Sequence, residues 1–557
     1  MLSLHNITLQ VGREPEPQTL LDDISLQIPA GHLCAIIGPA GSGKSTLVKV
    51  ITGLYTTTDG TVRWAGRDLA EEDLAPGDIG YVPQFSIAYD NLTVHESMDV
   101  TYRLRVSGLS REERAARIEA TLNEVGIAHI MDRRVKVLSG GEKRRLGMAM
   151  ELVSQPSLLI ADEVTSGLDA KAEEDIVQLM RSLARQDKRI VLSVTHNLRH
   201  LAAHDSVILL SQGQLVFHGT PAELLEYFGV DSAEEVFQKL AEHPPETWGR
   251  VWRQRAAKLH PPVSKEPDQA KLAMPNPVMQ LLVLLQRRWM IFFRDGSQVW
   301  LQLALMFGFP CLVVIFALDG LPQIKNMSMT SGKNVVQELR ESLVFTQDAA
   351  HVGGLVSGLI MVQVILLTLI GSNNSAREIA GERLIYEKEK LAGLSPFSYL
   401  VSKMLFLFTL VTAQSVWMAV FVNLVCRFPG DFGAQILLLM LVNGAMTAVC
   451  LAISSWMRSA EQASLVSIYL VGFQLPLSGA VLGLPEFARW LTRPFIAAYW
   501  SWSGMIQTMH ETRFYDVVQK VSPTDLSVLA LCFWVLIAHV FIGLVAAYLG
   551  CKQSRWE

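Results

Sequence analysis

Six long apolar runs constrain this chain more than any other feature of its sequence. Each is close to the roughly 20 residues that a helix needs to cross the hydrocarbon core of a bilayer. They cover residues 299–318, 352–371, 403–424, 434–455, 463–484 and 526–549. Packing as core helices of a soluble protein does not account for six such runs, so residues 299–557 are predicted to form an all-α, six-helix transmembrane domain.

The first 240 residues have a different character. They hold charges, turn residues and helix caps, and short apolar runs at 33–38, 157–163 and 189–196 alternate with helical stretches. This alternation is typical of an α/β domain with a largely parallel sheet. Residues 241–279 are rich in proline and are predicted to be a linker. Residues 280–298 mix aromatic residues with arginines and predict an amphipathic connecting helix in the headgroup layer, with an ordinary surface helix as the alternative.

Charge and cysteine usage exclude several classes of protein. The net charge of −5 over 557 residues provides no basic surface of the kind that binds nucleic acid. The six cysteines show no pairing pattern, so no disulfide framework is expected. The first residues lack the pattern of a cleaved signal peptide, which places the first domain in the cytoplasm. An even number of spans then returns the C-terminus there, and the apolar segment 485–525 is predicted to be re-entrant or interfacial on the outer side.

A phosphate-binding loop lies near the start of the first domain. Residues 38–45, GPAGSGKS, match G-x-x-x-x-G-K-[ST] between an apolar strand and a helix. Such a loop wraps phosphate oxygens with backbone N–H groups, adds a lysine charge on the outer phosphates, and offers a hydroxyl to Mg²⁺. The residues predicted to bind nucleotide here are Gly38, Gly41, Ser42, Gly43, Lys44, Ser45 and Thr46, with Ser45 also a metal ligand.

An acidic pair follows a second apolar strand, in LLIADE at residues 158–163. Asp162 at the strand end is predicted to reach the Mg²⁺ shell. Glu163 beside it is predicted to orient and deprotonate the attacking water. An acidic pair in this place is often only a helix cap, but its order behind the phosphate-binding loop favours the catalytic interpretation.

Three more polar residues follow in an order that supports the same site. Gln84 in YVPQF is predicted to touch the Mg²⁺ shell and a neighbouring domain, and His196 in SVTH to hold the γ-phosphate. Asp169 in SGLD is predicted to bridge two subunits. Each residue alone is more often structural, and only their common order after the phosphate-binding loop favours function.

Together these motifs resemble the ATP-binding-cassette (ABC) family across the whole first domain, residues 1–240. The resemblance rests on GPAGSGKST, YVPQ, LSGGE, LIADE, SGLD and SVTH. It implies ATP and Mg²⁺ as cofactors and ATP hydrolysis as the reaction. It also implies that Ser139, Gly140 and Gly141 are the signature loop, which contacts the γ-phosphate of an ATP held by a partner cassette. The region ITLQVGREPEPQT lacks the aromatic residue that the family places near adenine.

The second half resembles the G subfamily of ABC transporters and related bacterial type-2 exporters, through residues 377–403 and the SGAVLGLPEFARWLTRPF segment. The charged run 377–390 is interpreted as a coupling helix, with a solvated helix face as the alternative. Between their ends the spans contain no Asp, Glu, Lys or Arg. Their amides are interpreted as interhelical hydrogen-bonding groups rather than ligands. His539 is interpreted as a hydrogen-bonded packing residue, and Pro476 as a local break.

The resemblance therefore predicts an ATP-driven exporter acting as a dimer, with a second copy or a related half-transporter as partner. Its substrate is expected to be an amphipathic or lipid-like small molecule leaving the cytoplasm or inner leaflet. The alternatives are an importer, or a force-transmitting ATPase that passes no substrate. The expected location is a bacterial inner membrane, with the cassette and both termini cytoplasmic.

Overall fold

The computed structural model describes residues 1–12, 18–64, 67–68, 77–84, 88–256, 273–318, 321–322, 335–481, 483–522 and 524–553. The chain forms two compact units. The first comprises Met1–Gln280 together with Lys388–Leu394, and the second comprises Leu281–Glu387 and Ser395–Glu557. The chain therefore leaves the second unit at residue 388 and returns to it at residue 395.

The first unit contains two sheets. An antiparallel sheet has the order β2-β1-β4-β5, and a six-stranded sheet has the order β10-β9-β3-β8-β7-β6, parallel except for β10 at its edge. The strands are β1 Leu2–Val11, β2 Gln18–Ile28, β3 Leu33–Ile37, β4 Asp59–Trp64, β5 Arg67–Asp68, β6 Ile79–Val82, β7 Leu158–Asp162, β8 Ile190–Val194, β9 Ser206–Ser211 and β10 Gln214–Gly219. Strands β3 and β8 are buried along their whole length, as expected for a parallel sheet covered on both faces.

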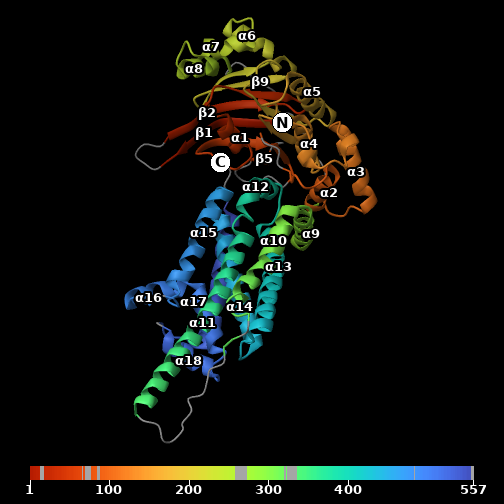
Figure 1. Ribbon diagram of the computed structural model, residues 1–557. Coiled ribbons are helices and arrows are strands. Elements are labelled where there is room, and N and C mark those ends of the chain that lie inside the picture. The colour runs from red at the N-terminus through yellow and green to blue at the C-terminus, as the bar shows by residue number, and fades with distance from the viewer. Residues whose placement is uncertain are drawn as a thin grey trace. The chain divides into compact units, whose positions relative to one another are not determined.

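Helices pack around these sheets (Figure 1). They are α1 Lys44–Ile51, α2 Val94–Arg105, α3 Arg111–Glu124, α4 Gly140–Leu152, α5 Ala170–Gln186, α6 Pro221–Phe228, α7 Val236–Leu240 and α8 Pro245–Ala256. Short 3-10 turns are η1 Ala128–Ile130, η2 Val135–Val137, η3 Leu201–Ala203 and η4 Ala233–Glu235. Capping boxes begin α2, α3, α4 and α6, where a Ser or Thr and a Glu three residues later satisfy each other's backbone N–H groups. The α/β cassette fold is as predicted.

One stretch expected to be linker is instead part of the folded cassette. Helix α8 lies within residues 241–279, and its Trp252 is 5% exposed in the core that also holds Phe217 and Phe228. The Trp252 and Phe217 ring centroids are 5.2 Å apart. The prolines of this stretch indicated a linker, but Pro245 opens a helix, where its missing N–H costs nothing. Residues 257–272 of the expected linker lie outside the described residues.

The second unit is helical, and α11 is its longest helix (Figure 1). Its elements, with the connecting helix α9 that the two units share, are α9 Pro277–Arg294, α10 Gly296–Val314, α11 Val335–Ser375, η5 Ala380–Glu382, α12 Arg383–Leu391, α13 Pro396–Cys426, α14 Phe432–Trp456, α15 Ala460–Leu477, α16 Glu486–Thr492, η6 Arg493–Phe495, α17 Ala497–Gln507, α18 Arg513–Val521 and α19 Leu529–Lys552. Within the described residues, five helical stretches are long and apolar enough to cross a membrane. They are Gly296–Val314, Ser342–Leu391, Pro396–Cys426, Phe432–Trp456 and Leu529–Lys552.

The span predicted at residues 463–484 differs from the others. Helix α15 begins at Ala460 but ends at Leu477, and its 18 residues are about 27 Å long. Gly479 follows with φ at +74°, and its carbonyl accepts a hydrogen bond of 2.7 Å from Thr524 Oγ1. A left-handed glycine turns the chain here, which the apolar run GAVLGL did not indicate. The span predicted at 352–371 also differs, because its helix α11 begins earlier, at Val335.

Small residues allow the helices of the second unit to approach closely. A Cβ added at Gly543 of α19 would lie 2.8 Å from the carbonyl carbon of Ala448 in α14, and one at Gly371 of α11 would lie 2.6 Å from the Asn443 carbonyl oxygen. Helices in membranes gain stability from such close packing because lipid supplies no hydrophobic force between them. These glycines therefore set the spacing of α11, α14 and α19.

We expect Gly371→Ala to destabilise the second unit by about 1–3 kcal/mol, the usual cost of overpacking a core. The new methyl group would meet backbone that is held within α14. Gly358→Ala on the same helix is the matched control, because a Cβ there would have no atom within 4 Å. Thermal unfolding of the purified protein in detergent measures the difference. Equal transition temperatures for the two variants would show that α11 and α14 are not in close contact at Gly371.

Candidate active site

Three segments that carry the predicted site leave the parallel sheet at the same edge. Strand β3 leads into Gly38, β7 ends at Asp162, and β8 leads into His196. The registers place Ile36 and Asp162 on either side of Val194 in β8. Because the carboxyl ends of parallel strands share one edge, residues far apart in the sequence meet there.

The phosphate-binding loop closes tightly between β3 and α1. A Cβ at Gly38 would lie 2.3 Å from the Leu210 carbonyl oxygen, so this position accommodates no side chain. Gly43 caps α1 with φ at +98°, a left-handed conformation that favours glycine. Ser45 and Thr46 lie in the first turn of α1, where helix N–H groups are free to bind an anion.

Two polar groups of the loop face its interior. The Lys44 ammonium donates to the carbonyl oxygens of Gly38 at 2.8 Å and Pro39 at 3.0 Å. The Ser42 hydroxyl is buried without a hydrogen-bond partner among the described residues. These two carbonyl groups are neutral, so they leave the positive charge of Lys44 uncompensated. Together with the nearby helix N–H donors, that charge suits the binding of a phosphate.

Gln84 and His196 both lie close to the Glu163 carboxylate at this edge of the sheet. Gln84 Nε2 donates to Glu163 Oε2 at 3.0 Å, and His196 Nδ1 lies 3.6 Å from Glu163 Oε1. The backbone of Glu163 has φ at +48°, and its N–H donates to the Val194 carbonyl at 2.9 Å. Left-handed backbone at a non-glycine residue is costly and is found where function requires a side-chain direction.

Asp162 is positioned by a neighbour from β6. The Tyr81 hydroxyl donates to Asp162 Oδ2 at 2.7 Å. Burial raises the pKa of Asp162, the Tyr81 hydrogen bond opposes this, and the adjacent Glu163 raises the pKa further. Burial lowers the pKa of Lys44, while Glu163 and Asp162 act in the opposite direction. Two adjacent carboxylates that disfavour each other's charge fit a divalent cation, so Asp162, with Ser45 and Gln84, would hold Mg²⁺.

The signature residues lie together with Asp169 in a different part of the cassette surface. Ser139 caps α4 in a capping box with Glu142, and Asp169 caps α5 by accepting from the Ala172 N–H at 2.9 Å. A Cβ at Gly140 would lie 3.1 Å from Leu168, so the two helix starts are neighbours. Both predicted dimer-contacting segments therefore form one patch that presents two helix N-termini, a suitable surface for the phosphate of another chain.

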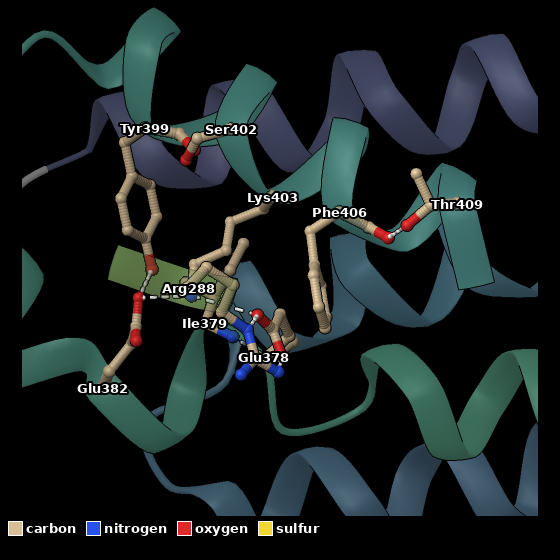
Figure 2. A network of polar contacts seen from close by, with 10 residues as sticks. Arg288, Glu378, Ile379, Glu382, Tyr399, Ser402, Lys403, Phe406 and Thr409 are labelled. Carbon is tan, nitrogen blue, oxygen red and sulfur yellow. Dashed lines mark hydrogen bonds and ion pairs between the residues drawn. The ribbon is translucent and has the colours of Figure 1, made fainter. Parts of the chain in front are cut away.

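A second cluster of charges lies in the second unit (Figure 2). Arg288 of α9 forms a bidentate pair with Glu378, at 2.6 and 2.9 Å. Lys403 of α13 contacts Glu378 at 3.0 Å and Glu382 at 2.7 Å, and the Tyr399 hydroxyl donates to Glu382 at 2.6 Å. Two cations thus pair with two carboxylates where α9, the 377–390 segment and α13 meet, and the buried Arg287 of α9 also acts electrostatically on Glu382.

Several amides inside the bundle form interhelical hydrogen bonds, as predicted, whereas Gln363 Oε1 and Asn443 Oδ1 are buried without a hydrogen-bond partner among the described residues. Gln302, Asn374 and Gln414 form a closed ring in which each amide donates to the next, at 3.0, 2.8 and 2.7 Å. Gln474 accepts from the Ala498 N–H at 3.1 Å and so caps α17. His539 Nδ1 lies 2.8 Å from the Val535 carbonyl oxygen.

Two features of the charged residues were not predicted. Tyr81 is the first residue of the YVPQ motif, in which only Gln84 was predicted to have a role. In the coupling segment 377–390, Glu387 is buried 3.9 Å from Arg383, and Glu389 follows two residues later. Lys388 between them contacts Glu151, which lies 237 positions earlier in the chain. No local pattern indicates a pair of this separation.

Comparison with known proteins agrees with this geometry. Residues 21–166 match the ABC transporter family, and residues 279–510 match the ABC-2 type transporter family. The ABC transporter ATP-binding/permease protein Rv1747 of Mycobacterium tuberculosis is 31% identical over 478 residues, which are 84% of this chain and 53% of that protein. The chain thus spans about half the length of this relative.

Other similarities involve the cassette alone. The methionine import ATP-binding protein MetN of Corynebacterium jeikeium is 36% identical over 37% of this chain and 56% of that protein. A solved structure, a dimeric post-hydrolysis state of the ATP-binding cassette MJ0796 bound to ADP and Pi, is 28% identical, with a TM-score of 0.36. It covers 40% of this chain and 98% of its own.

The protein is a membrane-associated ATPase with a nucleotide-binding cassette. It belongs to the ABC transporter family, and its membrane domain is of the ABC-2 type. Its cassette is of the kind that binds ATP with Mg²⁺.

We expect Glu163→Gln to retain ATP binding and to lower hydrolysis about 10²- to 10⁴-fold, the usual contribution of a general base. The amide keeps an oxygen that can accept from Gln84 but cannot take a proton from water. Binding of a fluorescent ATP analogue and phosphate release measure the two steps. Glu174→Gln, on the exposed face of α5, is the control. Hydrolysis near the wild-type rate in Glu163→Gln would remove Glu163 from the role of base.

Proposed function

We propose that this protein is an ATP-driven exporter that works as a dimer and moves an amphipathic or lipid-like small molecule out of the cytoplasm or inner leaflet. The observation that carries the proposal is the convergence of Lys44, Asp162, Glu163, Gln84 and His196 at one sheet edge, in a chain that also holds an ABC-2 membrane domain. In this proposal Glu163 is the general base, His196 holds the γ-phosphate, and Asp162, Ser45 and Gln84 surround Mg²⁺.

The presence of two phosphate-binding surfaces within one cassette supports a dimer. The loop at residues 38–46 lies at the end of β3, whereas Ser139, Gly140 and Gly141 begin α4 beside Leu168. Each surface presents helix N–H groups suited to the same kind of anion. Two copies, or this chain and a related half-transporter, would bring one surface of each type to each ATP, with Asp169 beside the contact.

The chemistry of the second unit favours an uncharged or amphipathic substrate. Its charged groups Arg288, Glu378, Glu382 and Lys403 neutralise one another, and the amides Gln302, Asn374 and Gln414 are satisfied within the bundle. Between their ends the predicted spans contain no Asp or Glu, the residues that line an ion path in a membrane. The connecting helix α9 exposes Leu282 and Phe293, which suits the headgroup layer of a membrane.

Import is the second candidate, because the cassette is similar to that of a methionine importer. Export is favoured here by the fusion of cassette and membrane domain in one chain, a feature of the type-2 exporters that it resembles. The proposed location is a bacterial inner membrane, with the cassette and both termini in the cytoplasm and residues 485–525 on the outer side. A force-transmitting ATPase that passes no substrate is the third candidate.

Transport direction can be measured in liposomes that contain phospholipids with a fluorescent headgroup. ATP added outside energises only those molecules whose cassettes face the medium. Export would carry the labelled lipid from the outer to the inner leaflet, so the fraction quenched by external dithionite should fall with Mg-ATP. Glu163→Gln is the control and should show no change.

The other outcomes separate the candidates. An ATP-dependent rise in the quenched fraction would favour import. Hydrolysis without movement of lipids of any headgroup, or of amphipathic dyes, would contradict the proposed substrate class.

A further inference from the structure

A buried carboxylate in the cassette contacts two cations at once. Glu151, 2% exposed in the last turn of α4, forms a bidentate pair with Arg105 of α2, with both N···O distances at 3.1 Å. Lys388 Nζ lies 2.8 Å from Glu151 Oε1 and is itself 4% exposed. Burial raises the pKa of Glu151, but Arg105 and Lys388 outweigh burial and lower the pKa to about 2. The carboxylate is therefore ionised throughout the physiological range.

The folding of the cassette alone does not require the second cation. The Arg105 fork already satisfies both oxygens of Glu151, and Arg105 also donates to the Met150 carbonyl at 3.1 Å. Burying a lysine is costly unless a well-placed partner compensates for its lost hydration. Because Glu151 is already paired with Arg105, the added contact with Lys388 fixes the position of the segment that carries Lys388.

That segment is joined covalently to the second unit at both of its ends. Lys388–Leu394 belongs to the first unit, while residues 387 and 395 on either side belong to the second. Besides the Lys388–Glu151 ion pair, a hydrogen bond from Gln280 Nε2 to the Gly393 carbonyl at 3.3 Å holds it. Gly393, with φ at +95°, ends α12 where the Leu394 N–H returns to the Glu389 carbonyl. The segment is thus a short, well-defined helix end.

The other end of α4 carries the signature loop. Ser139 caps the helix, and Glu151 follows 12 residues later, about 18 Å along the axis. An α-helix of this length, buried along one side, moves as a rigid body. A displacement of the signature loop when it meets nucleotide would therefore displace Glu151.

We propose that Glu151 is a positioning residue through which α4 transmits the state of the signature loop to Lys388, and thereby to the chain that continues into the membrane domain. This inference rests on the proposed function, because it explains how ATP binding would drive transport. It assigns the cassette side of the coupling to one carboxylate and the membrane side to Lys388, rather than to Glu387 or Glu389.

Lys388→Met is the appropriate variant, because it keeps the stem of the side chain and leaves the Arg105–Glu151 pair intact. Glu151→Gln would instead leave two buried cations without a counter-charge and is expected to unfold the cassette. Lys390→Met in the same helix is the charge control, and Lys388→Arg should restore the wild-type behaviour.

The first measurement is hydrogen exchange of the full-length chain in the Glu163→Gln background, with and without Mg-ATP. We expect ATP to change exchange both at the start of α4 and in Lys388–Leu394. With Lys388→Met, the change at α4 should remain while the change in the 388–394 segment is lost. The inference would be overturned if ATP changed exchange in the 388–394 segment equally with and without the Lys388→Met substitution. It would also be overturned if ATP changed exchange there in neither protein. This readout requires no transport substrate, so it is independent of the proposed function.

The second measurement is the number of lipids moved per ATP hydrolysed. Lys388→Met should leave basal hydrolysis and the KM for ATP within about twofold of wild type and reduce the ratio roughly tenfold, within the usual range of coupling between sites. An unchanged ratio would contradict the inference. A parallel loss of basal hydrolysis and thermal stability would also contradict it, since it would indicate a purely structural role. If the wild-type protein moves no lipid, the proposed function fails, and hydrogen exchange still decides the role of Lys388.

Discussion

The parallel register of β3, β8 and β7 is the constraint on which the ATP chemistry depends. It brings the phosphate-binding loop, the Asp162–Glu163 pair and His196 to one edge, although Gly38 and His196 are 158 positions apart in the sequence. The polar side chains there are held from neighbouring elements, Asp162 by Tyr81 and Glu163 by Gln84. A shift of any one strand by a single residue would turn these side chains to the other face of the sheet.

Motifs that act through their own backbone could be predicted from the sequence, and pairs that act across the fold could not. The phosphate-binding loop is contiguous, because its glycines and the helix that follows must lie together to wrap a phosphate. The Tyr81–Asp162 and Glu151–Lys388 contacts join residues 81 and 237 positions apart, so their partners are chosen by packing. The end of α15 was missed because Gly479 turns the chain within an apolar run, where hydropathy alone predicts continuation.

Charge is arranged differently in the two units, in keeping with their surroundings. The nucleotide site leaves Lys44 and two carboxylates accessible to a charged ligand. In the second unit, Arg288, Glu378, Glu382 and Lys403 pair near the ends of the predicted spans, and the amides of Gln302, Asn374 and Gln414 pair inside the bundle. Low-dielectric surroundings make unpaired charge costly, so this pairing suits helices that cross a membrane.

The central claim is that two chains share each ATP, and complementation between two inactive variants tests it most directly. Lys44→Ala and Ser139→Phe should each fail to trap ATP as separate dimers, because every shared site then has one damaged half. A mixed dimer of differently tagged chains should trap ATP at one site, built from the intact Lys44 of one chain and the intact Ser139 of the other. Trapping no greater in verified mixed dimers than in the separate variants would contradict the claim.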